Sequence, residues 1–327
     1  MTVSGACLYW ATRGTDWGNV GRLIGSADPA WILAVVGLSL GSHLLRAQRW
    51  RILLRPVVAA PYGAALSATL VGFAASMVLP LRAGEIVRPW LFSRRVGIGL
   101  APAAASVVVE RLLDMLLVLT CFVVVTFSYP ALAWYRPMAL AVGAVGAGFL
   151  GTLYLSARYR RWTDAFVERL TASLPLRPQR LVRALAAGVL DGARGLGEPP
   201  TLVLVLALSA ILWMMITGTY LVSFLALAVV VPLVPASLAS VVIVAAFVFL
   251  PQAPGFVGTW QKACDVSLGL FGVPHDQIVA YSLLTWVIQI VVNVGAGAVA
   301  LAFQDLSVRD LVSVSKGDAS SARVENG

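Results

Sequence analysis

The fold follows from one stretch, residues 77–88, which reads MVLPLRAGEIVR and lies between strongly apolar segments. Pro80 and Gly84 interrupt the helix that the flanking residues favour. Irregular backbone deep in an apolar environment is stable only where protein or a water-filled cavity satisfies its polar groups. Because Arg82, Glu85 and Arg88 accompany the break, the stretch predicts a binding site or a pathway.

The composition of the whole chain places these apolar segments in a membrane. The 327 residues are 59% hydrophobic and 12% charged, and the mean hydropathy is +0.87, which is typical of a polytopic helical membrane protein. The net charge of +9 comes almost wholly from arginines that flank apolar segments, which argues against a nucleic-acid-binding face. The three cysteines are isolated, so we expect no disulfide, metal or cofactor.

A second charge cluster, formed by Glu110, Arg111 and Asp114, lies inside the apolar segment 100–127. At about 100° per residue the three side chains share one face of a helix, and Glu110 lies about 15 Å along it, near the middle of a bilayer. Two interpretations are compatible with this position: a structural lock between Arg111 and its acidic neighbours, or a relay for substrate or protons. We expect this cluster to meet the charges of residues 82–88.

The arginine positions decide how the first half crosses the membrane. Residues 29–54 form the first convincing span, after a short first helix, and we expect the arginine-rich end of this span in the cytoplasm. If residues 63–79 crossed completely, two arginine-rich loops would be external, against the positive-inside rule. A re-entrant hairpin over 63–96 instead places every such loop inside. His43, within the first span, is compatible with a buried hydrogen-bonded residue or a proton relay.

The later segments complete the predicted fold. We expect spans at 100–127, 138–156, 201–231 and 275–303, an amphipathic cytoplasmic connector over 158–198 that joins two halves, and a disordered cytoplasmic tail over 304–327. The fold class is therefore an all-α polytopic membrane protein. Residues 1–303 form a single transmembrane domain with about six to seven spanning helices and two re-entrant broken-helix hairpins.

The second hairpin is predicted from an interruption like the first. Residues 251–260 read PQAPGFVGTW, in which Pro251 and Gly255 have the same spacing as the earlier proline and glycine. A glycine-containing turn follows each interruption, at Gly97 and at Gly272, and a full-length span follows each turn. Paired broken helices in two halves are typical of inverted-repeat transporters, so we expect the two hairpins to be arranged as an inverted repeat.

Four motifs, in order and at suitable intervals, carry a resemblance to a known family: RAQRWRILL at 46–54, LPLRAGEIVR at 79–88, SVVVERLLD at 106–114, and residues 251–259. Over about residues 16–303 the chain resembles the flippase-like family named for the transmembrane region of lysylphosphatidylglycerol synthetase. The resemblance implies a lipid-translocating membrane domain, as in the flippase half of bacterial multiple peptide resistance factors. It also implies a relation to membrane regions attached to some lipid-linked glycosyltransferases.

From the motifs and the resemblance we expect a lipid translocase, not an enzyme. Its substrate would be an amphiphile with an anionic or phosphate-bearing headgroup, such as a phospholipid or a polyprenyl-phosphate-linked glycolipid. Gly84 and Gly255 would begin returning half-helices whose positive ends point toward the middle of the membrane. The expected substrate-binding residues are Arg46, Arg49, Arg82, Gly84, Glu85, Arg88, Glu110, Arg111, Asp114, Pro251, Pro254, Gly255, Gly258, Thr259, Gln289 and Asn293.

Two other functions are compatible with the sequence. One is an integral-membrane lipid headgroup transferase, with Glu110, Asp114 or His43 as the base, although the metal-spaced clusters and nucleotide-binding loops of such enzymes are not evident. The other is an accessory subunit of a lipid-modifying complex. Expected partners are the membrane lipid substrate, anionic lipids at the cytoplasmic face and a separate lipid synthetase or glycosyltransferase, in the plasma membrane of a bacterial-type cell.

Overall fold

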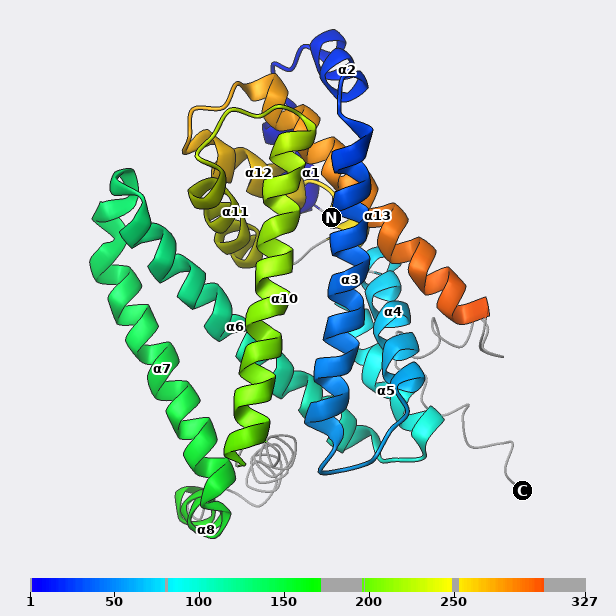
Figure 1. Cartoon of the computed structure of the whole chain (residues 1–327), viewed down its shortest axis with the longest axis vertical. Coiled ribbons are helices and arrows are strands. Elements are labelled where there is room, and N and C mark those ends of the chain that lie inside the picture. The colour runs from blue at the N-terminus through cyan, green and yellow to red at the C-terminus, as the bar shows by residue number, and fades with distance from the viewer. Residues whose placement is uncertain (1, 80–81, 172–195, 197, 249–252, 303–327) are drawn as a thin grey trace.

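The computed structural model describes residues 2–79, 82–171, 196, 198–248 and 253–302, and every regular element in these ranges is a helix (Figure 1). The longer elements are α1 (Thr2–Thr12), α2 (Trp17–Gly25), α3 (Pro29–Leu54), α4 (Tyr62–Val78), α5 (Gly84–Val96), α6 (Leu100–Ser128), α7 (Arg136–Arg158), α8 (Arg160–Thr171), α10 (Pro199–Ala226), α11 (Leu233–Val248), α12 (Thr259–Gly269) and α13 (His275–Ala302). The predicted all-α polytopic class is confirmed.

Four of the described helical segments are long and apolar enough to cross a membrane. They are α3, Pro130–Ser156 (which includes most of α7), α10 and α13. α6 is as long, at 29 residues, but it carries the cluster at Glu110, Arg111 and Asp114. The expected count of about six to seven spanning helices, besides the two re-entrant hairpins, stays a prediction.

Local sequence signals explain where the long helices begin and end. Pro29 is the first residue of α3, and the Asp28 carboxylate caps the helix by accepting a hydrogen bond from the Ala30 N–H at 2.8 Å. α10 ends at Ala226, earlier than predicted. The reason is that Ala228 adopts a positive φ of 48°, which turns the chain out of the helix.

Two four-helix units with matching contacts form most of the fold. The first unit is α3 to α6, the second is α10 to α13, and in each unit every helix packs on the next. Between the units α3 packs along α10, α4 packs on α13, and α6 packs on α11, so each contact has its counterpart. In Figure 1 α3 and α10 run in opposite directions, and the hairpins α4–α5 and α11–α12 lie toward opposite ends of the molecule. This arrangement is the inverted repeat expected from the sequence.

The α4–α5 hairpin is packed so closely that its crossing point has no room for a side chain. Gly84 begins α5, as predicted, and a Cβ atom there would overlap the Gly72 carbonyl oxygen and the Ser76 hydroxyl of α4. Arg82, at the tip of the hairpin, has a φ of 56°. This left-handed conformation is uncommon for residues other than glycine, so the tip is held in a specific shape.

The second hairpin corrects the prediction that Gly255 starts the returning helix. Gly255 lies in a short 3-10 helix, η4 (Pro254–Phe256), with a φ of 70°, and α12 begins only at Thr259. The start of α12 is set by Gly258, whose φ is 80° and whose N–H donates to Gln261 Oε1 at 2.7 Å. Equal proline–glycine spacing therefore does not mark equivalent helix starts in the two hairpins.

The arginine-rich helix ends lie at one end of the molecule. The last turns of α3 and α5 and the start of α8 are at the lower end in Figure 1, whereas α2 and the start of α13 are at the upper end. The lower ends carry Arg51, Arg94, Arg95, Arg158 and Arg161. This grouping favours a first hairpin that opens toward the arginine-rich side. α8 is the described start of the connector 158–198. Residues 172–195 and the predicted tail 304–327 lie outside the described ranges.

Candidate functional site

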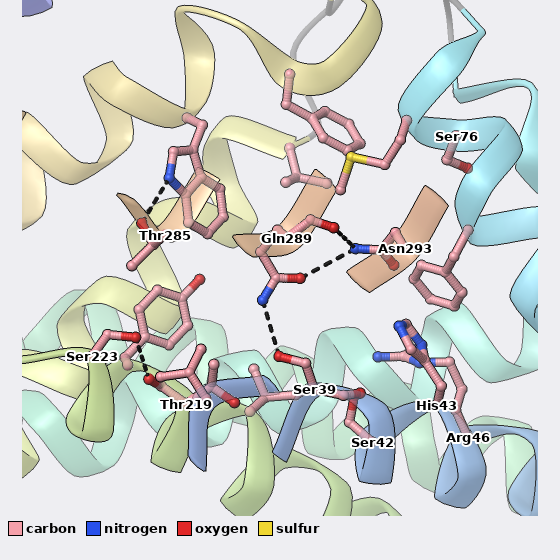
Figure 2. Close-up of a pocket in the computed structure, with 18 of the residues that line it drawn as sticks. Ser39, Ser42, His43, Arg46, Ser76, Thr219, Ser223, Thr285, Gln289 and Asn293 are labelled. Carbon is pink, nitrogen blue, oxygen red and sulfur yellow. Dashed lines mark hydrogen bonds between the residues drawn. The ribbon is translucent and has the colours of Figure 1, made fainter. Parts of the chain in front are cut away.

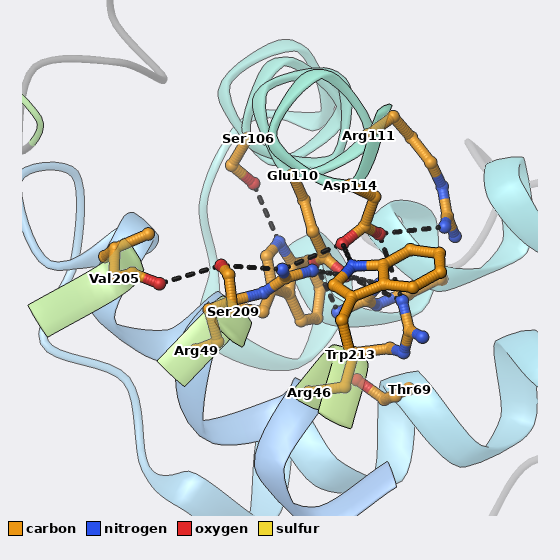
Figure 3. Close-up of polar contacts among 12 residues, drawn as sticks. Arg46, Arg49, Thr69, Ser106, Glu110, Arg111, Asp114, Val205, Ser209 and Trp213 are labelled. Atoms are coloured by element: carbon orange, nitrogen blue, oxygen red, sulfur yellow. Dashed lines mark hydrogen bonds and ion pairs between the residues drawn. The ribbon is translucent and has the colours of Figure 1, made fainter. Parts of the chain in front are cut away.

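Five buried charged side chains from three helices meet beside the first hairpin, and we call them the charged lock (Figure 3). They are Arg46 and Arg49 of α3, Arg88 of α5, and Glu110 and Asp114 of α6, and none is more than 7% exposed. Arg49 lies 2.8 Å from Asp114 and 3.2 Å from Glu110. Arg46 lies 3.2 Å from Asp114, and Arg88 lies 3.0 Å from Glu110. The lock therefore joins α3, α5 and α6.

Neutral side chains complete the lock, and two of them come from the second unit. Arg49 Nη1 donates to Ser209 Oγ at 2.9 Å, and Trp213 Nε1 donates to Asp114 Oδ1 at 3.2 Å, both from α10. Sequence reasoning missed Ser209 and Trp213, although they are four residues apart and thus share one helix face. The sequence alone did not indicate that this face packs against α6.

The two charge clusters meet as predicted, but Arg111 is not the partner of Glu110. Glu110 pairs with Arg46, Arg49 and Arg88, because its side chain points about 100° away from that of the next residue on the helix. Fully desolvated ion pairs that satisfy one another hold helices together, and breaking one leaves an uncompensated charge. The geometry therefore favours the structural interpretation for the charged lock.

A second, partly exposed set of charges lies at the edge of a cavity. Glu85 Oε1 is 2.7 Å from Arg82 Nη2 and 3.5 Å from Arg111 Nε, and Arg111 Nη1 is 3.4 Å from Asp114 Oδ2. The side chains of Arg82, Glu85 and Arg111 are 27%, 34% and 31% exposed. Two guanidinium groups share one carboxylate here, so this edge carries excess positive charge and unfilled hydrogen-bond donors.

The cavity itself lies between the two units and has a volume of about 280 Å³ (Figure 2). The predicted residues Gln289 and Asn293 of α13 lie in its wall, with Arg46, Arg82, Glu85 and Arg111. The Gln289 amide donates to Ser39 Oγ at 3.2 Å, and the Asn293 amide donates to the Gln289 carbonyl oxygen at 2.7 Å. Other polar side chains in the wall are Ser42, His43, Ser76, Thr219, Ser223 and Thr285.

A periodic signal in the sequence could have identified the α3 side of the cavity. Polar residues recur there at positions 39, 42, 43, 46 and 49, the three- and four-residue spacing of a single helix face. One such stripe in an apolar span indicates a face turned toward protein or water. The sequence predicts Arg46 and Arg49 both as a topology signal and as substrate-binding residues, but it does not by itself connect them with Ser39, Ser42 and His43.

The remaining predicted residues shape the backbone around the cavity. Gly84 permits the close α4–α5 crossing, and Pro254 begins η4. The Gly255 carbonyl accepts a hydrogen bond from Trp286 Nε1 at 2.6 Å, which holds the second hairpin tip against α13. Thr259 is buried, and its hydroxyl donates to the Phe256 carbonyl at 2.9 Å. Pro251 lies outside the described residues.

The two units differ in charge at corresponding positions. Gly97 and Gly272 adopt left-handed conformations, with φ of 72° and 70°, in the turn before the last helix of each unit, so they serve as common reference points. Counted from these glycines, each charged residue of α5 and α6 in the lock has a neutral counterpart: Arg88 corresponds to Ala263, Glu110 to Thr285, and Asp114 to Gln289.

This replacement leaves open space in the second unit. Ala263 and Gln289 line a smaller, mostly apolar cavity of about 100 Å³, next to the larger one. Met77, Phe256 and Trp260 border both cavities. The first unit thus fills the corresponding region with arginine side chains, whereas the second leaves it open to the space between the units.

The cavity wall offers hydrogen-bond donors and guanidinium groups rather than metal ligands. Within the described ranges, no group of three or more His, Cys, Asp or Glu residues could hold a metal ion. Guanidinium and amide N–H groups bind anionic and polar oxygen atoms well. The site is therefore suited to a polar or anionic group brought into an otherwise apolar protein.

Fold and site together define a multi-pass helical membrane protein with a polar cavity between two inverted units. The family model described as "Lysylphosphatidylglycerol synthase TM region" matches residues 1–297, and the chain belongs to this family. This confirms the resemblance seen in the sequence motifs and gives the protein an integral-membrane, lipid-related function. Comparisons with curated proteins and with solved structures found no match.

Proposed function

We propose that the protein is a lipid translocase that moves an amphiphile with an anionic or phosphate-bearing headgroup between the leaflets. The observation that carries this proposal is the cavity between the inverted units, with the partly exposed Arg82 and Arg111 at its edge. A headgroup in the hydrocarbon core needs a substitute for water, because burying a charge without partners is very costly. A polar cavity within the membrane domain supplies that substitute.

The arginines suit phosphate in both charge and geometry. A guanidinium group presents planar donors that match two oxygen atoms of a phosphate at once. Glu85 already holds Arg82 and Arg111, so an arriving phosphate would compete with a carboxylate rather than meet bare cations. That competition limits the affinity, as transport requires, because a headgroup bound too tightly would not be released.

The size of the cavity supports a mode of transport in which only the headgroup of the lipid enters the protein. A volume of about 280 Å³ is near the lower end of ligand pockets, which run from roughly 300 to 1,000 Å³. It can hold a headgroup but not the long hydrocarbon chains. The chains would remain among the lipids while the headgroup passes between the units.

The proposal assigns no covalent step to the protein. It includes the plasma membrane of a bacterial-type cell as the location, with the arginine-rich helix ends on the cytoplasmic side, where they would contact anionic lipids. A separate lipid synthetase or glycosyltransferase would supply the substrate.

Reconstitution of the purified protein tests the proposal. Proteoliposomes would contain a trace of phosphatidylglycerol with a fluorescent acyl chain, and a membrane-impermeant reductant would bleach the outer leaflet. We expect bleaching to exceed the half seen in protein-free vesicles, and to fall back toward it in a double variant, Arg82→Ala and Arg111→Ala. A chemically altered lipid without translocation would support the transferase. Neither activity until a partner is added would support the accessory subunit.

A further inference from the structure

One side of α3 turns away from the cavity and changes from apolar to basic along its length. Its members, which recur at the spacing of a single helix face, are Gly41, Leu44, Gln48, Arg51 and Arg55. At about 100° per residue they lie opposite the polar stripe that lines the cavity. Leu44 is 48% exposed, Gln48 and Arg51 are half-buried, and Arg55 is exposed. This side of α3 therefore faces the surroundings of the protein.

The apolar part of this side forms one wall of a groove between α3 and α10, which pack along each other (Figure 1). Leu44 and Leu45 line the groove from α3, and Ile211 and Met215 line it from α10. Gly41 keeps the two helices close at one end, because a Cβ atom there would lie 2.6 Å from Met215 Cε. Since α3 and α10 belong to different units, the groove follows the boundary between the units on the outside of the protein.

Polar groups with donors to spare lie at the other end of the groove. Gln48 lines the groove, and its amide has no hydrogen-bond partner among the described residues. Tyr62 of α4 also lines it, donates its hydroxyl hydrogen to the Leu44 carbonyl at 3.0 Å, and lies with its ring centre 5.8 Å from the Arg51 guanidinium. Within the described ranges no acidic side chain pairs with Arg51 or Arg55. An amide and two guanidinium groups are therefore available to a ligand.

The order of these groups along the groove matches the order of the parts of a phospholipid. The apolar wall accepts a hydrocarbon chain, the Gln48 amide can donate to an ester carbonyl oxygen, and the guanidinium groups suit a phosphate. Gln48 and Arg51 are about 4.5 Å apart along the helix axis, so both can reach one lipid molecule. The arginine end is the end that the positive-inside rule places at the cytoplasmic leaflet, where anionic lipids gather.

A second copy of the chain fits this groove less well than a lipid does. In a dimer with a twofold axis along the membrane normal, the same surface of both copies meets. Arg51 and Arg55 of the two copies would then face one another at the same depth, where like charges repel. An anionic headgroup instead neutralises these guanidinium groups.

We infer that an anionic phospholipid binds in the α3–α10 groove as a resident ligand, separate from any molecule that enters the cavity. Its chain lies against Leu44, Leu45 and Ile211, and its phosphate lies at Arg51 and Arg55. Because the lipid contacts α3 and α10 together, it stabilises the contact between the two units. The inference goes beyond the proposed function and does not depend on it, since the groove and the cavity lie on opposite sides of α3.

Thermal unfolding of the delipidated full-length protein in detergent tests this inference. The micelles would contain an increasing mole fraction of phosphatidylglycerol or of phosphatidylcholine with the same chains. A ligand that binds only the folded protein raises the unfolding temperature. We expect phosphatidylcholine to need about a tenfold higher mole fraction for the same rise, because its headgroup carries no net charge for the arginines to neutralise. Native mass spectrometry should find one phosphatidylglycerol retained per protein.

Variants at the polar end test the headgroup contacts. Arg51→Gln should raise the mole fraction of phosphatidylglycerol needed for the same stabilisation about tenfold, and Gln48→Leu about fivefold. Arg94→Gln is the matched control, because Arg94 lies at the same end of the molecule, is exposed, and also has its guanidinium near an aromatic ring, 5.2 Å from the centre of Trp90. This control should respond to both lipids as the wild-type protein does.

A second pair of variants tests the chain-binding part of the groove. Leu44→Trp should fill the groove and remove the difference between the two lipids. Leu40→Trp is the matched control, since Leu40 lies one turn earlier on the same side of α3 and is 41% exposed, but it does not line the groove. The unfolding temperature of each variant without lipid shows that it is folded.

Three results would overturn the inference. One is equal stabilisation by both lipids, or equal weakening in Arg51→Gln and Arg94→Gln. Another is loss of the phosphatidylglycerol effect in the double variant Arg82→Ala and Arg111→Ala, which would assign the bound lipid to the cavity. The third is a lipid-free dimer, measured by light scattering, that Leu44→Trp abolishes, because the occupant would then be a second copy. Each of these results leaves the proposed translocase function standing.

Discussion

Arg88 of α5 and Glu110 of α6 form an ion pair at 3.0 Å, with both side chains almost completely buried. The pair ties the returning half of the first hairpin to the middle of the neighbouring helix. The Arg88 guanidinium also lies 4.1 Å from the centre of the Trp50 ring of α3, where a cation–π contact adds to the attraction. Arg88 therefore belongs to the interior of the first unit, whereas Arg82, at the tip of the same hairpin, borders the cavity.

The burial of an arginine should decide how much its loss destabilises the protein, and Arg49 and Arg111 differ in this respect. Arg49→Ala should lower the free energy of unfolding by about 3 to 5 kcal/mol, because it leaves buried carboxylates without their partner. Arg111→Ala should cost about 1 kcal/mol or less, because its side chain is 31% exposed and such pairs contribute little. Thermal unfolding in detergent measures both. Equal losses would mean that Arg111 also belongs to the charged lock.

A lysine substitution at Arg82 separates binding of a headgroup from membrane topology. Lysine carries the same charge but lacks the planar pair of donors, so Arg82→Lys should insert and fold normally yet lose most lipid translocation. Arg88→Lys should instead lower the unfolding temperature, because one ammonium group cannot reproduce the two contacts that the Arg88 guanidinium makes with the Glu110 carboxylate. Translocation by Arg82→Lys at the wild-type rate, at equal protein density, would remove Arg82 from the site.

The close crossing of the first hairpin predicts a steric effect at Gly84. Gly84→Ala should destabilise the protein by about 1 to 3 kcal/mol, because the added methyl group has no space against α4. Gly63→Ala is the matched control near the start of the same hairpin, where a Cβ meets nothing within 4 Å. That variant should be neutral or slightly stabilising. Unfolding temperatures in detergent compare the two, and a neutral Gly84→Ala would mean that the hairpin can separate freely.

Cysteine labelling tests the orientation of the helix ends. In a background without Cys7, Cys121 and Cys264, single cysteines at the exposed positions Arg94 and Arg161 should react only from the cytoplasmic side. A cysteine at Trp134, which is 89% exposed in the turn before α7, should react only from outside. External labelling at position 94 alone would show that α4 and α5 do not form a hairpin open to the cytoplasm.

Much of the fold could be predicted from the sequence, because a membrane restricts which secondary structures an apolar segment can form. Long apolar runs in a membrane form helices. The predicted ends of α3 and α13 lie within one residue of the observed ends. Pro80 and Gly84 located the first hairpin, because α5 begins at the glycine itself. The start of α12 was missed because it depends on the φ of Gly258 and on the bond from its N–H to Gln261, which a proline–glycine spacing does not encode.

The site was predictable only in part, because residue types do not determine pairing between helices. The sequence indicated that Glu110 and Asp114 need partners, and arginines near them were plentiful. Which arginines become buried depends on how α3 and α5 pack on α6, and this packing buries Arg49 completely while leaving Arg111 at the edge. Tyr281, in the cavity wall, was missed for the same reason: an aromatic residue in an apolar span gives no sign that it faces a cavity.

The neutral positions of the second unit have a consequence for motion. Separating Arg88 from Glu110 would expose two opposite charges to a medium of low dielectric, so the first unit resists internal rearrangement. Ala263, Thr285 and Gln289 impose no such penalty on the second. If the cavity opens alternately to each leaflet, we therefore expect the first unit to stay rigid. The movement would occur in the second unit, by sliding of α12 and α13 against their neighbours.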